Sequence, residues 1–341
     1  MNWLALQRSA LAQVVLRPLS LAYGAMVGAR VRGYASGRRT QKRLRAAVVS
    51  VGNLTVGGAG KTPMVLWLAE KFIAQGRRVA ILSRGYRGEK GSSDEVELLR
   101  ARLGTRAVVA AGADRFATGA AVEAAQPVDI FLLDDGFQHL QLARDVDILL
   151  MDTSQSLNGE ALLPAGRLRE PVSAMARADV LVFTRAETQP GISGAVSSLQ
   201  AYPVFAAKTK LLGFRRLGEE NGRLLGAGEI GAGPFFAFCG LGNPQQFFRD
   251  LENWNIPVSG QRAFADHHRY TAAEATELER ATGAAHACAM ITTEKDANNL
   301  TDVKLPAFPV FLAVIDIEVA QEEEFLGLIQ AKLAGRGGVA Q

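Results

Sequence analysis

The 341-residue sequence predicts an α/β fold, with helices on both faces of a parallel sheet and a second, smaller α/β domain. Two observations lead to this prediction. Short apolar runs alternate along the chain with segments of helical pattern, and the runs are mostly apolar rather than alternating between apolar and polar residues. Strands of that kind are covered on both faces, as they are in parallel sheets. A chain of this length normally divides into two domains.

The first 45 residues form a basic, apolar arm. They contain nine cations, and the first acid of the chain is Glu70, so the rest carries 29 cations against 34 acids. The longest charge-free stretch, 18–29, would span about 18 Å as a helix, less than the roughly 30 Å of a bilayer core. We therefore expect a helix lying in a membrane interface. A core-packing helix and a cleaved signal peptide are the alternatives.

A large domain is expected over residues 46–205. It begins with a strand at 46–51 and a helix at 63–74. Further strands are predicted at 78–82, 107–111, 129–133, 146–151 and 179–183. In such a sheet, ligands bind beyond the carboxyl ends of the strands.

The pattern changes at residues 206–233. Two ribbons, 208–217 and 223–227, are joined by the turn sequence EENG at 219–222, which predicts a two-stranded connector. A smaller α/β domain is expected over 234–332, with strands at 235–239, 289–292 and 310–315 and helices near 244–254 and 272–282. Residues 333–341 read as a flexible tail.

Composition excludes several functions. The two cysteines, Cys239 and Cys288, lie far apart, which fits a reducing compartment and excludes a CxxC metal site. Aromatic residues make up 7% of the chain and do not alternate with basic ones. Single-strand nucleic-acid binding normally needs such stacking residues, so we expect no nucleic-acid partner.

The strongest motif is the glycine-rich segment 52–63, GNLTVGGAGKTP, between a predicted strand and a predicted helix. In that context it predicts a phosphate-binding P-loop, in which backbone amides and a helix N-terminus face phosphate oxygens. Lys61 would reach the terminal phosphates, and the Thr62 hydroxyl would bind Mg²⁺. The strict motif requires glycine at position 55, where this chain has threonine; Gly57 and Gly58 are expected to supply the flexibility. The nucleotide-binding candidates are Thr55, Val56, Gly57, Gly58, Ala59, Gly60, Lys61 and Thr62.

An acidic pair supplies the second part of the predicted site. Asp134 and Asp135 follow the apolar run 131–133 directly, as a metal-binding acid at the end of a strand would. Adjacent residues of an extended chain point to opposite faces, so only one of the two can ligate the metal at once. Asp152, which also ends a predicted strand, is a weaker rival.

Nine motifs occur in one order along the chain, and together they resemble the tetraacyldisaccharide 4'-kinase family. The resemblance extends from the arm to about residue 315. The motifs are GNLTVGGAGKTP at 52–63, SRGY at 83–86, Asp94-Glu95, GADR at 112–115, LDDGFQH at 133–139, LPAGRLREP at 163–171, CGLGNPQQF at 239–247, Asp266-His267-His268 and TEKD at 293–296.

The resemblance implies a P-loop lipid kinase of lipid A biosynthesis. Such an enzyme transfers the γ-phosphate of ATP to the 4'-hydroxyl of a tetraacylated glucosamine disaccharide 1-phosphate and forms lipid IVA. It further implies Mg²⁺ as cofactor, a two-stranded connector between two domains, and a membrane-associated N-terminal helix. We expect a monomer at the cytoplasmic face of the bacterial inner membrane, peripheral or anchored by the arm.

The resemblance also implies roles for residues that look ordinary in the sequence. Asp94 would be the base that takes the proton of the acceptor hydroxyl, supported by His267, with His268 as the rival histidine. Arg115 would join Lys61 in stabilising the transferred phosphoryl group. The further candidates near the site are Glu95, Gln138, His139, Arg169 and Glu170.

Two other functions are compatible with a P-loop. A hydrolase of the metallochaperone or GTPase kind would need a base-specificity motif such as NKxD, which FTRAE at 183–187 resembles only faintly. A membrane-bound nucleotide-sensing scaffold would not need Asp94 or the acid–histidine cluster at 266–268.

Overall fold

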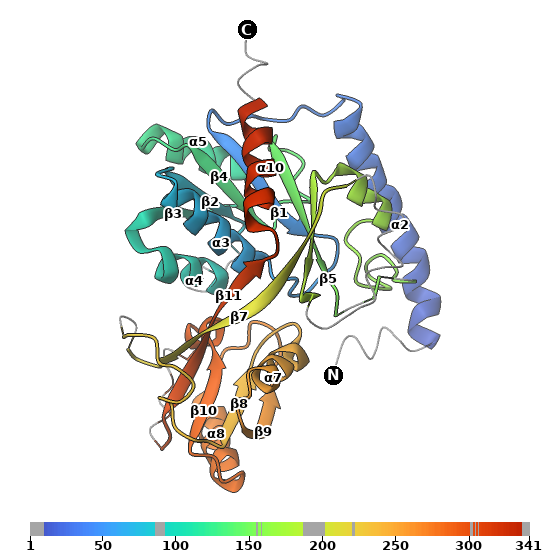
Figure 1. Cartoon of the computed structure of the whole chain (residues 1–341). Helices are drawn as coiled ribbons and strands as arrows, with labels where there is room; N and C mark the ends of the chain where they lie inside the picture. Colours follow the sequence, from blue (N-terminus) through green and yellow to red (C-terminus); the bar gives the residue numbers. More distant parts are fainter. Residues whose placement is uncertain are drawn as a thin grey trace. The chain divides into compact units, whose positions relative to one another are not determined.

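The computed structural model describes residues 10–335 except 86–92, 155, 158, 187–201, 220–221, 301–302, 304 and 306. The chain forms two compact units (Figure 1). The first comprises Met1–Gly85, Leu103–Lys208 and Val319–Gln341, and the second comprises Tyr86–Arg102 and Thr209–Glu318. We describe each unit by itself.

The sheet of the first unit is parallel and places the phosphate-loop strand at its centre. Its strands are β3 (Ala107–Ala111), β2 (Val79–Ser83), β4 (Ile130–Asp134), β1 (Ala47–Asn53), β5 (Val146–Asp152), β6 (Val180–Thr184) and the start of β7 (Val204–Arg216), in that spatial order. Strands β2, β4 and β6 are buried along their whole length. This burial explains why their sequences are apolar throughout.

Helices cover the sheet of this unit. They are α3 (Lys61–Ala74), α5 (Arg115–Ala125) and α10 (Glu322–Gly335), with short 3₁₀ turns η1 (Gly104–Arg106) and η2 (Val172–Arg177). Helices α3 and α10 meet through Trp67 and Phe325, whose ring centroids are 5.8 Å apart. Helix α5 instead packs on a separate buried cluster that includes Val48 of β1 and Phe131 of β4. The strand and helix positions expected from the apolar runs are confirmed to within a few residues.

The second unit contains four parallel strands and its own core. Its strands lie in the order β11 (Val310–Val319), β10 (Ala289–Thr293), β8 (Phe235–Cys239) and β9 (Val258–Ala263), all parallel. Its helices are α4 (Asp94–Leu103), α7 (Pro244–Asn253), α8 (Ala272–Ala284) and the single turn α9 (Glu294–Ala297). Two buried clusters, around Phe235 and around Phe238, form its core.

The units do not follow the expected domain boundaries in every place. Helix α4 lies with the second unit, although its residues fall inside the span 46–205, and α10 lies with the first unit, although it falls inside 234–332. The connector also differs. Strand β7 runs for 13 residues, while the expected second ribbon shows one isolated bridge, between Leu225 and Phe214. Tertiary packing, which sequence periodicity does not encode, decides these assignments.

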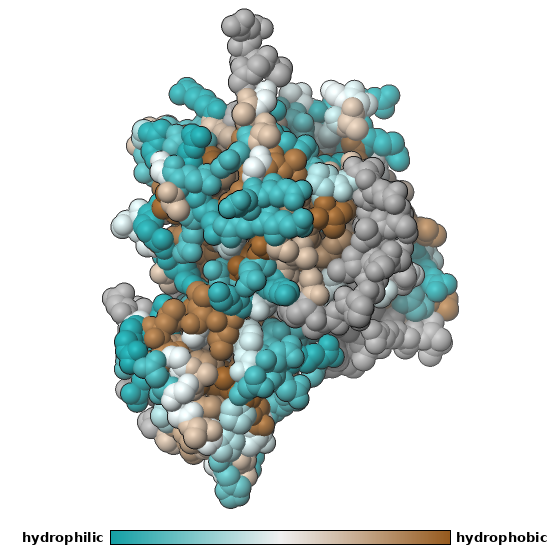
Figure 2. Space-filling model, in the orientation of Figure 1, coloured by the Kyte–Doolittle hydropathy of each residue, from teal (hydrophilic) through white to brown (hydrophobic). Residues whose placement is uncertain are grey.

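The arm is one long helix, α2 (Ala10–Ala35), in the first unit. At 26 residues it extends about 39 Å, longer than the charge-free stretch 18–29, and by length and composition alone Ala12–Ala35 is long and apolar enough to cross a membrane. A helix lying in the membrane interface stays a prediction. Three side chains, Gln13, Ser20 and Tyr23, bond carbonyl groups of Ala165, Leu162 and Arg169. Val14, Leu21 and Met26 are exposed, and brown atoms of the helix are visible at the right-hand margin of Figure 2.

Candidate functional site

The glycine-rich segment leaves β1 at Asn53 and enters α3 at Lys61, as the sequence predicts. Two glycines make its turn possible: Gly57 has φ 115° and Gly60 has φ 80°, values that side chains with a Cβ rarely adopt. Of the two glycines expected to supply flexibility, Gly57 has a positive φ, and Gly60 is the second loop glycine that does. Thr55 forms a bridge with Leu168. The backbone there is paired, so position 55 does not need glycine.

Lys61 lies in a network of polar groups at the carboxyl ends of β1 and β4. Its Nζ donates to Oδ1 of Asn53 at 3.1 Å and lies 3.5 Å from Oδ1 of Asp135. Asp135 also accepts two hydrogen bonds from Arg169, at 2.6 and 2.8 Å. Burial alone would raise the pKa of Asp135, but the charges of Lys61 and Arg169 outweigh burial and lower it. This acid is therefore ionised in the neutral pH range.

The acidic pair is divided between two environments. Asp134 is the buried last residue of β4, whereas Asp135 faces Lys61 and Arg169. Asp135 has φ 54°, a left-handed conformation that is uncommon for a residue other than glycine and that occurs at functional sites. Gln138 completes this group by donating from Nε2 to the carbonyl oxygen of Asn53 at 3.0 Å. We name Asn53, Lys61, Asp135, Gln138 and Arg169 the phosphate-loop cluster.

The remaining candidates of the first unit are placed differently. Arg115 is the buried first residue of α5, and its neighbour Asp114 caps the helix through the amide of Ala117. Burial, with the charges of Arg115 and Arg144, lowers the pKa of His139 to about 4, so this imidazole is neutral at pH 7. Glu170 is buried and forms two hydrogen bonds with Arg177, at 2.8 and 2.9 Å.

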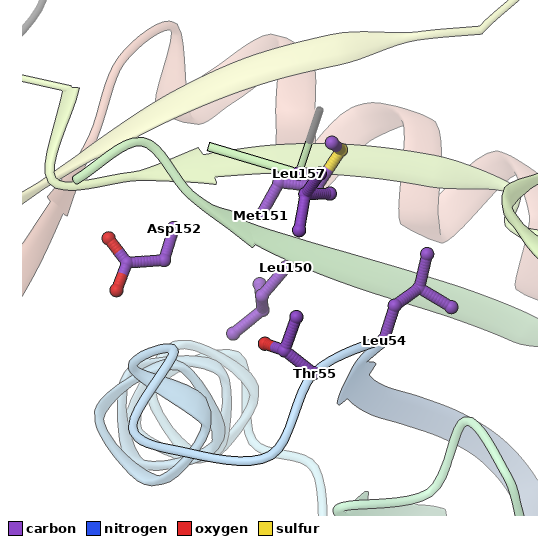
Figure 3. Close-up of a pocket in the computed structure, with 6 residues that line it drawn as sticks. All are labelled: Leu54, Thr55, Leu150, Met151, Asp152 and Leu157. Atoms are coloured by element: carbon purple, nitrogen blue, oxygen red, sulfur yellow. The ribbon is translucent and has the colours of Figure 1, made fainter. Parts of the chain in front are cut away.

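Beside the loop lies a small pocket lined by Leu54, Thr55, Leu150, Met151, Asp152 and Leu157 (Figure 3). Its volume of about 20 Å³ accommodates one water molecule, far less than a nucleotide. Asp152 accepts hydrogen bonds from Ser154 and pairs with Arg185. Its carboxylate is thereby committed to a local turn, so Asp152 is a poor rival to Asp135.

In the second unit, α4 begins with Asp94, which pairs with His267 from the loop after β9. Nδ1 of His267 lies 2.8 Å from Oδ1 and 2.9 Å from Oδ2 of Asp94. Burial would raise the pKa of Asp94, but the hydrogen bond from His267 and the charge of Lys295 outweigh it and lower the pKa. The same hydrogen bond raises the pKa of His267, against burial and Lys295. His267 has φ 57°, again a left-handed conformation outside glycine.

The structure separates the two adjacent histidines. His268 is committed elsewhere: its Nε2 lies 3.0 Å from Oε1 of Glu274, and its ring stacks on Phe264 with centroids 4.8 Å apart. Glu274 belongs to the capping box that begins α8 with Thr271. His268 therefore stabilises the start of a helix, while its neighbour His267 contacts Asp94.

Two residues at these clusters were not assigned a role from the sequence. Asn53 holds Lys61 and ends β1 at the start of the loop motif. Lys295 places its Nζ 3.0 Å from Asp266, 3.7 Å from Asp94 and 3.9 Å from Glu95. Asn53 lies inside the motif at 52–63 and Lys295 inside the motif at 293–296, and these motifs were the only sequence signal that could have indicated a role for them. We name Asp94, Glu95, Asp266, His267 and Lys295 the dyad cluster.

Metal binding can be assessed at both clusters. Among the described residues, Asp94, Glu95 and His267 offer ligand atoms within 4.8 Å of one another. The ammonium of Lys295 already neutralises charge there, so a metal is not required. At the phosphate loop, the Thr62 hydroxyl and the carboxylates of Asp134 and Asp135 are hard oxygen donors of the kind that Mg²⁺ prefers. The oxygen donor set and the ionised state of Asp135 fit that ion.

Comparison with known proteins gives a consistent result. The profile of the family described as tetraacyldisaccharide-1-P 4'-kinase matches residues 12–334. A tetraacyldisaccharide 4'-kinase of Geobacter metallireducens is 38% identical over 326 residues, covering 89% of this chain and 94% of the relative. That of Syntrophobacter fumaroxidans is 39% identical over 325 residues, covering 88% and 83%.

A solved structure is also similar. It is the crystal structure of LpxK from Aquifex aeolicus in complex with ATP. The TM-score is 0.74 at 30% identity, and the match covers 94% of this chain and 99% of the other.

Proposed function

The chain belongs to the tetraacyldisaccharide-1-P 4'-kinase family, and from this premise we propose how its two polar clusters divide the work of phosphoryl transfer. The protein is an ATP-dependent lipid A 4'-kinase. The reaction joins the γ-phosphate of ATP to the 4'-hydroxyl of the acylated disaccharide 1-phosphate. Such a reaction needs a group that stabilises the transferred phosphoryl charge and a group that receives the hydroxyl proton.

The phosphate-loop cluster is proposed to bind the triphosphate. In the structure Lys61 and Arg169 both face Asp135, so the two cations are held at the end of the loop by one acid. When a triphosphate enters, Lys61 exchanges Asn53 and Asp135 for phosphate oxygens, and the amides of 57–62 at the start of α3 supply further donors. Arg115 is proposed to assist Lys61, as the family motif implies.

Mg²⁺ is proposed as the cofactor, held by the Thr62 hydroxyl and by the acids that end β4. When bound, it neutralises charge on the β- and γ-phosphates. Asp135 is the more direct candidate because it is ionised and faces Lys61, whereas Asp134 is buried in β4. Arg169 orients Asp135 through two hydrogen bonds, and Gln138 accepts from the same guanidinium at 3.5 Å.

The dyad cluster is proposed to act on the acceptor. A sugar hydroxyl is a poor nucleophile, and a carboxylate within hydrogen-bonding reach can take its proton as the bond to phosphorus forms. Asp94 is ionised, and His267 donates to it from Nδ1, which orients the carboxylate in the manner of other acid–histidine pairs. The single observation that carries this assignment is the 2.8 Å contact between Asp94 and His267.

The lipid acceptor and the long exposed helix support a location at a membrane. One face of α2 bonds the segment 162–169 of the same unit, and other residues of α2 expose apolar side chains. We propose that this exposed surface contacts lipid at the cytoplasmic face of the inner membrane, and that the enzyme acts as a monomer. A hydrolase or a non-catalytic scaffold would leave the dyad cluster without a role.

The proposal is tested by incubating the purified protein with radiolabelled ATP and the disaccharide 1-phosphate in detergent micelles. We expect labelled lipid to form, and to disappear when Mg²⁺ is chelated. ATP binding without labelled lipid would contradict the assignment. ATP consumption that does not depend on the lipid would favour the hydrolase.

A further inference from the structure

The motif TEKD at 293–296 makes several contacts in the second unit, and the proposed reaction assigns it no role. Thr293 caps the turn α9 by accepting from the amide of Asp296. Asp296 is buried and accepts from the amide of Gly240 at 2.7 Å and from the hydroxyl of Tyr270 at 2.8 Å. Glu294 pairs with Arg102, the penultimate residue of α4, at 2.9 Å. These contacts fix the backbone on both sides of Lys295.

The same turn is joined to the start of α4. Nδ2 of Asn298, just after α9, donates to the carbonyl oxygen of Asp94 at 3.3 Å. With the pair between Glu294 and Arg102, this bond connects α9 to both ends of α4. Lys295 is thus presented to Asp94 and Glu95 by a rigid local frame, and its side chain is largely buried, at 17% exposed.

Lys295 is the cation at the centre of three carboxylates. Its Nζ lies within 4 Å of oxygen atoms of Asp94, Glu95 and Asp266 and 3.5 Å from Nε2 of His267. Three carboxylates this close together would repel one another and take up protons if no cation lay among them. The ammonium disfavours a proton on Nε2, whereas Glu95 and Asp266, each with an oxygen 3.8 Å from Nε2, favour one. Asp94 accepts from Nδ1.

We propose that Lys295 is a positioning residue that sets the protonation state of the Asp94–His267 pair. It keeps the carboxylates ionised and opposes the protonation of Nε2 of His267 that the nearby carboxylates of Glu95 and Asp266 favour. This inference rests on the proposed function, because it gives the base of that reaction its charge state. Among the described residues of this unit, the charged groups facing the pair are Glu95 of α4, Asp266 of the loop after β9 and Lys295 of α9.

The test compares Lys295→Met with Lys295→Arg and with the control Lys210→Met, which removes an exposed ammonium from the same unit. The titration of the His267 imidazole is followed by NMR in full-length protein with labelled histidine, assigned with His267→Gln. We expect Lys295→Met to move the midpoint to higher pH, and Lys295→Arg and Lys210→Met to leave it near the wild-type value. Asp266→Asn should move it the opposite way, because it removes a negative charge and leaves the ammonium.

Kinetics give the second measurement. Lys295→Met should lower kcat on the order of tenfold or more, part of the roughly 10²–10⁴-fold that general-base catalysis contributes, with KM for ATP unchanged and partial recovery in Lys295→Arg. An unchanged imidazole titration in Lys295→Met, or shifts of one sign in Lys295→Met and Asp266→Asn, would overturn the inference. The NMR measurement needs no substrate, so it still decides the role of Lys295 if the wild-type protein transfers no phosphate to the lipid.

Discussion

The phosphate-loop cluster and the dyad cluster both combine basic side chains with carboxylates, but their net charges have opposite signs. In the first, Lys61 and Arg169 surround the single ionised acid Asp135. In the second, Lys295 is surrounded by three carboxylates. Excess cation suits a site for phosphate oxygens, and excess carboxylate suits a site that receives a proton. The sign of the excess charge, more than the residue types, distinguishes the two tasks.

Both clusters also contain one residue in a left-handed conformation, Asp135 and His267. Each of them follows or lies near the end of a strand, where the chain turns sharply. Non-glycine residues in this conformation cost free energy that surrounding contacts must offset. In each cluster the residue in this conformation also forms an ion pair, Asp135 with Arg169 and His267 with Asp94.

The largest effect is expected for Lys61→Ala, which removes the cation that would contact the transferred phosphoryl group. We expect transfer to fall by at least about 10³-fold, since removal of one charge-stabilising donor costs about 10²–10³-fold and nucleotide binding also weakens. Labelled lipid is measured under saturating ATP. The matched control is Lys332→Ala, which breaks a partly exposed ion pair with Asp179; retained transfer in Lys61→Ala would refute the assignment of the loop.

Asp135→Ala belongs to the same cluster and is expected to abolish transfer as well. It leaves Lys61 and Arg169 without their shared acid and removes the ionised candidate ligand for Mg²⁺. The measurement is the rate of transfer as Mg²⁺ is titrated. If transfer in Asp135→Ala equals that of the wild type at every Mg²⁺ concentration, the metal assignment is wrong.

Asp94→Ala is expected to have the next largest effect on transfer. It distinguishes the contribution of the dyad cluster from that of the phosphate-loop cluster. Loss of the base should slow transfer by about 10²–10⁴-fold, while ATP affinity stays at the wild-type value because the phosphate-loop cluster is intact. Kinetics and equilibrium nucleotide binding are measured on the same preparation. Turnover near the wild-type rate would remove the role of Asp94 and show that positioning alone suffices.

The adjacent histidines offer a sharper comparison at smaller magnitude. His267→Ala should lower kcat on the order of 10²-fold because Asp94 loses the group that orients it. His268→Ala should leave kcat nearly unchanged and lower thermal stability, because His268 supports the start of α8 through Glu274. Equal losses of kcat in two folded variants would show that the pairs are not independent.

The smallest expected effect is a change of stability with pH. The pKa of His267 is raised in the folded protein, so its contribution to the free energy of unfolding is fully present below the ordinary value near 6.5 and is lost as pH rises through the folded pKa. The pKa of Asp94 is lowered, so its contribution is present above its ordinary value and is lost as pH falls through the folded pKa. Urea unfolding of the wild type and of His267→Gln from pH 5 to 9 measures the contribution of His267 to the free energy of unfolding. A stability difference that does not shrink toward alkaline pH would contradict it.

The fold was largely predictable because buried parallel strands have a simple signature. Runs such as 129–133 and 235–239 are apolar on both faces, and both are strands in the structure. Helix α4 was not predicted; its mean hydropathy is low and its placement depends on contacts such as that between Arg102 and Glu294. No local sequence pattern could therefore have predicted that α4 belongs to the second unit.

The candidate site was predictable to different degrees in the two clusters. The loop 52–63 and the acid pair at 134–135 are short motifs at the ends of neighbouring strands, whose shared sheet edge brings them together. Asp94, His267 and Lys295 are separated by up to 201 positions and lie in three unrelated motifs. Family resemblance supplied the first two, and no spacing argument connected Lys295 to them.

The sequence by itself determined the parallel sheet, the glycine loop with its lysine and the apolar arm, because each follows from hydrophobic periodicity or from the backbone conformations of glycine. Only the tertiary structure decided which acid faces Lys61, which histidine contacts Asp94 and where the ammonium of Lys295 lies. The physical reason is that these choices depend on the direction of side chains and on the balance of charges over a few ångströms. Those quantities are set when segments distant in the chain pack together.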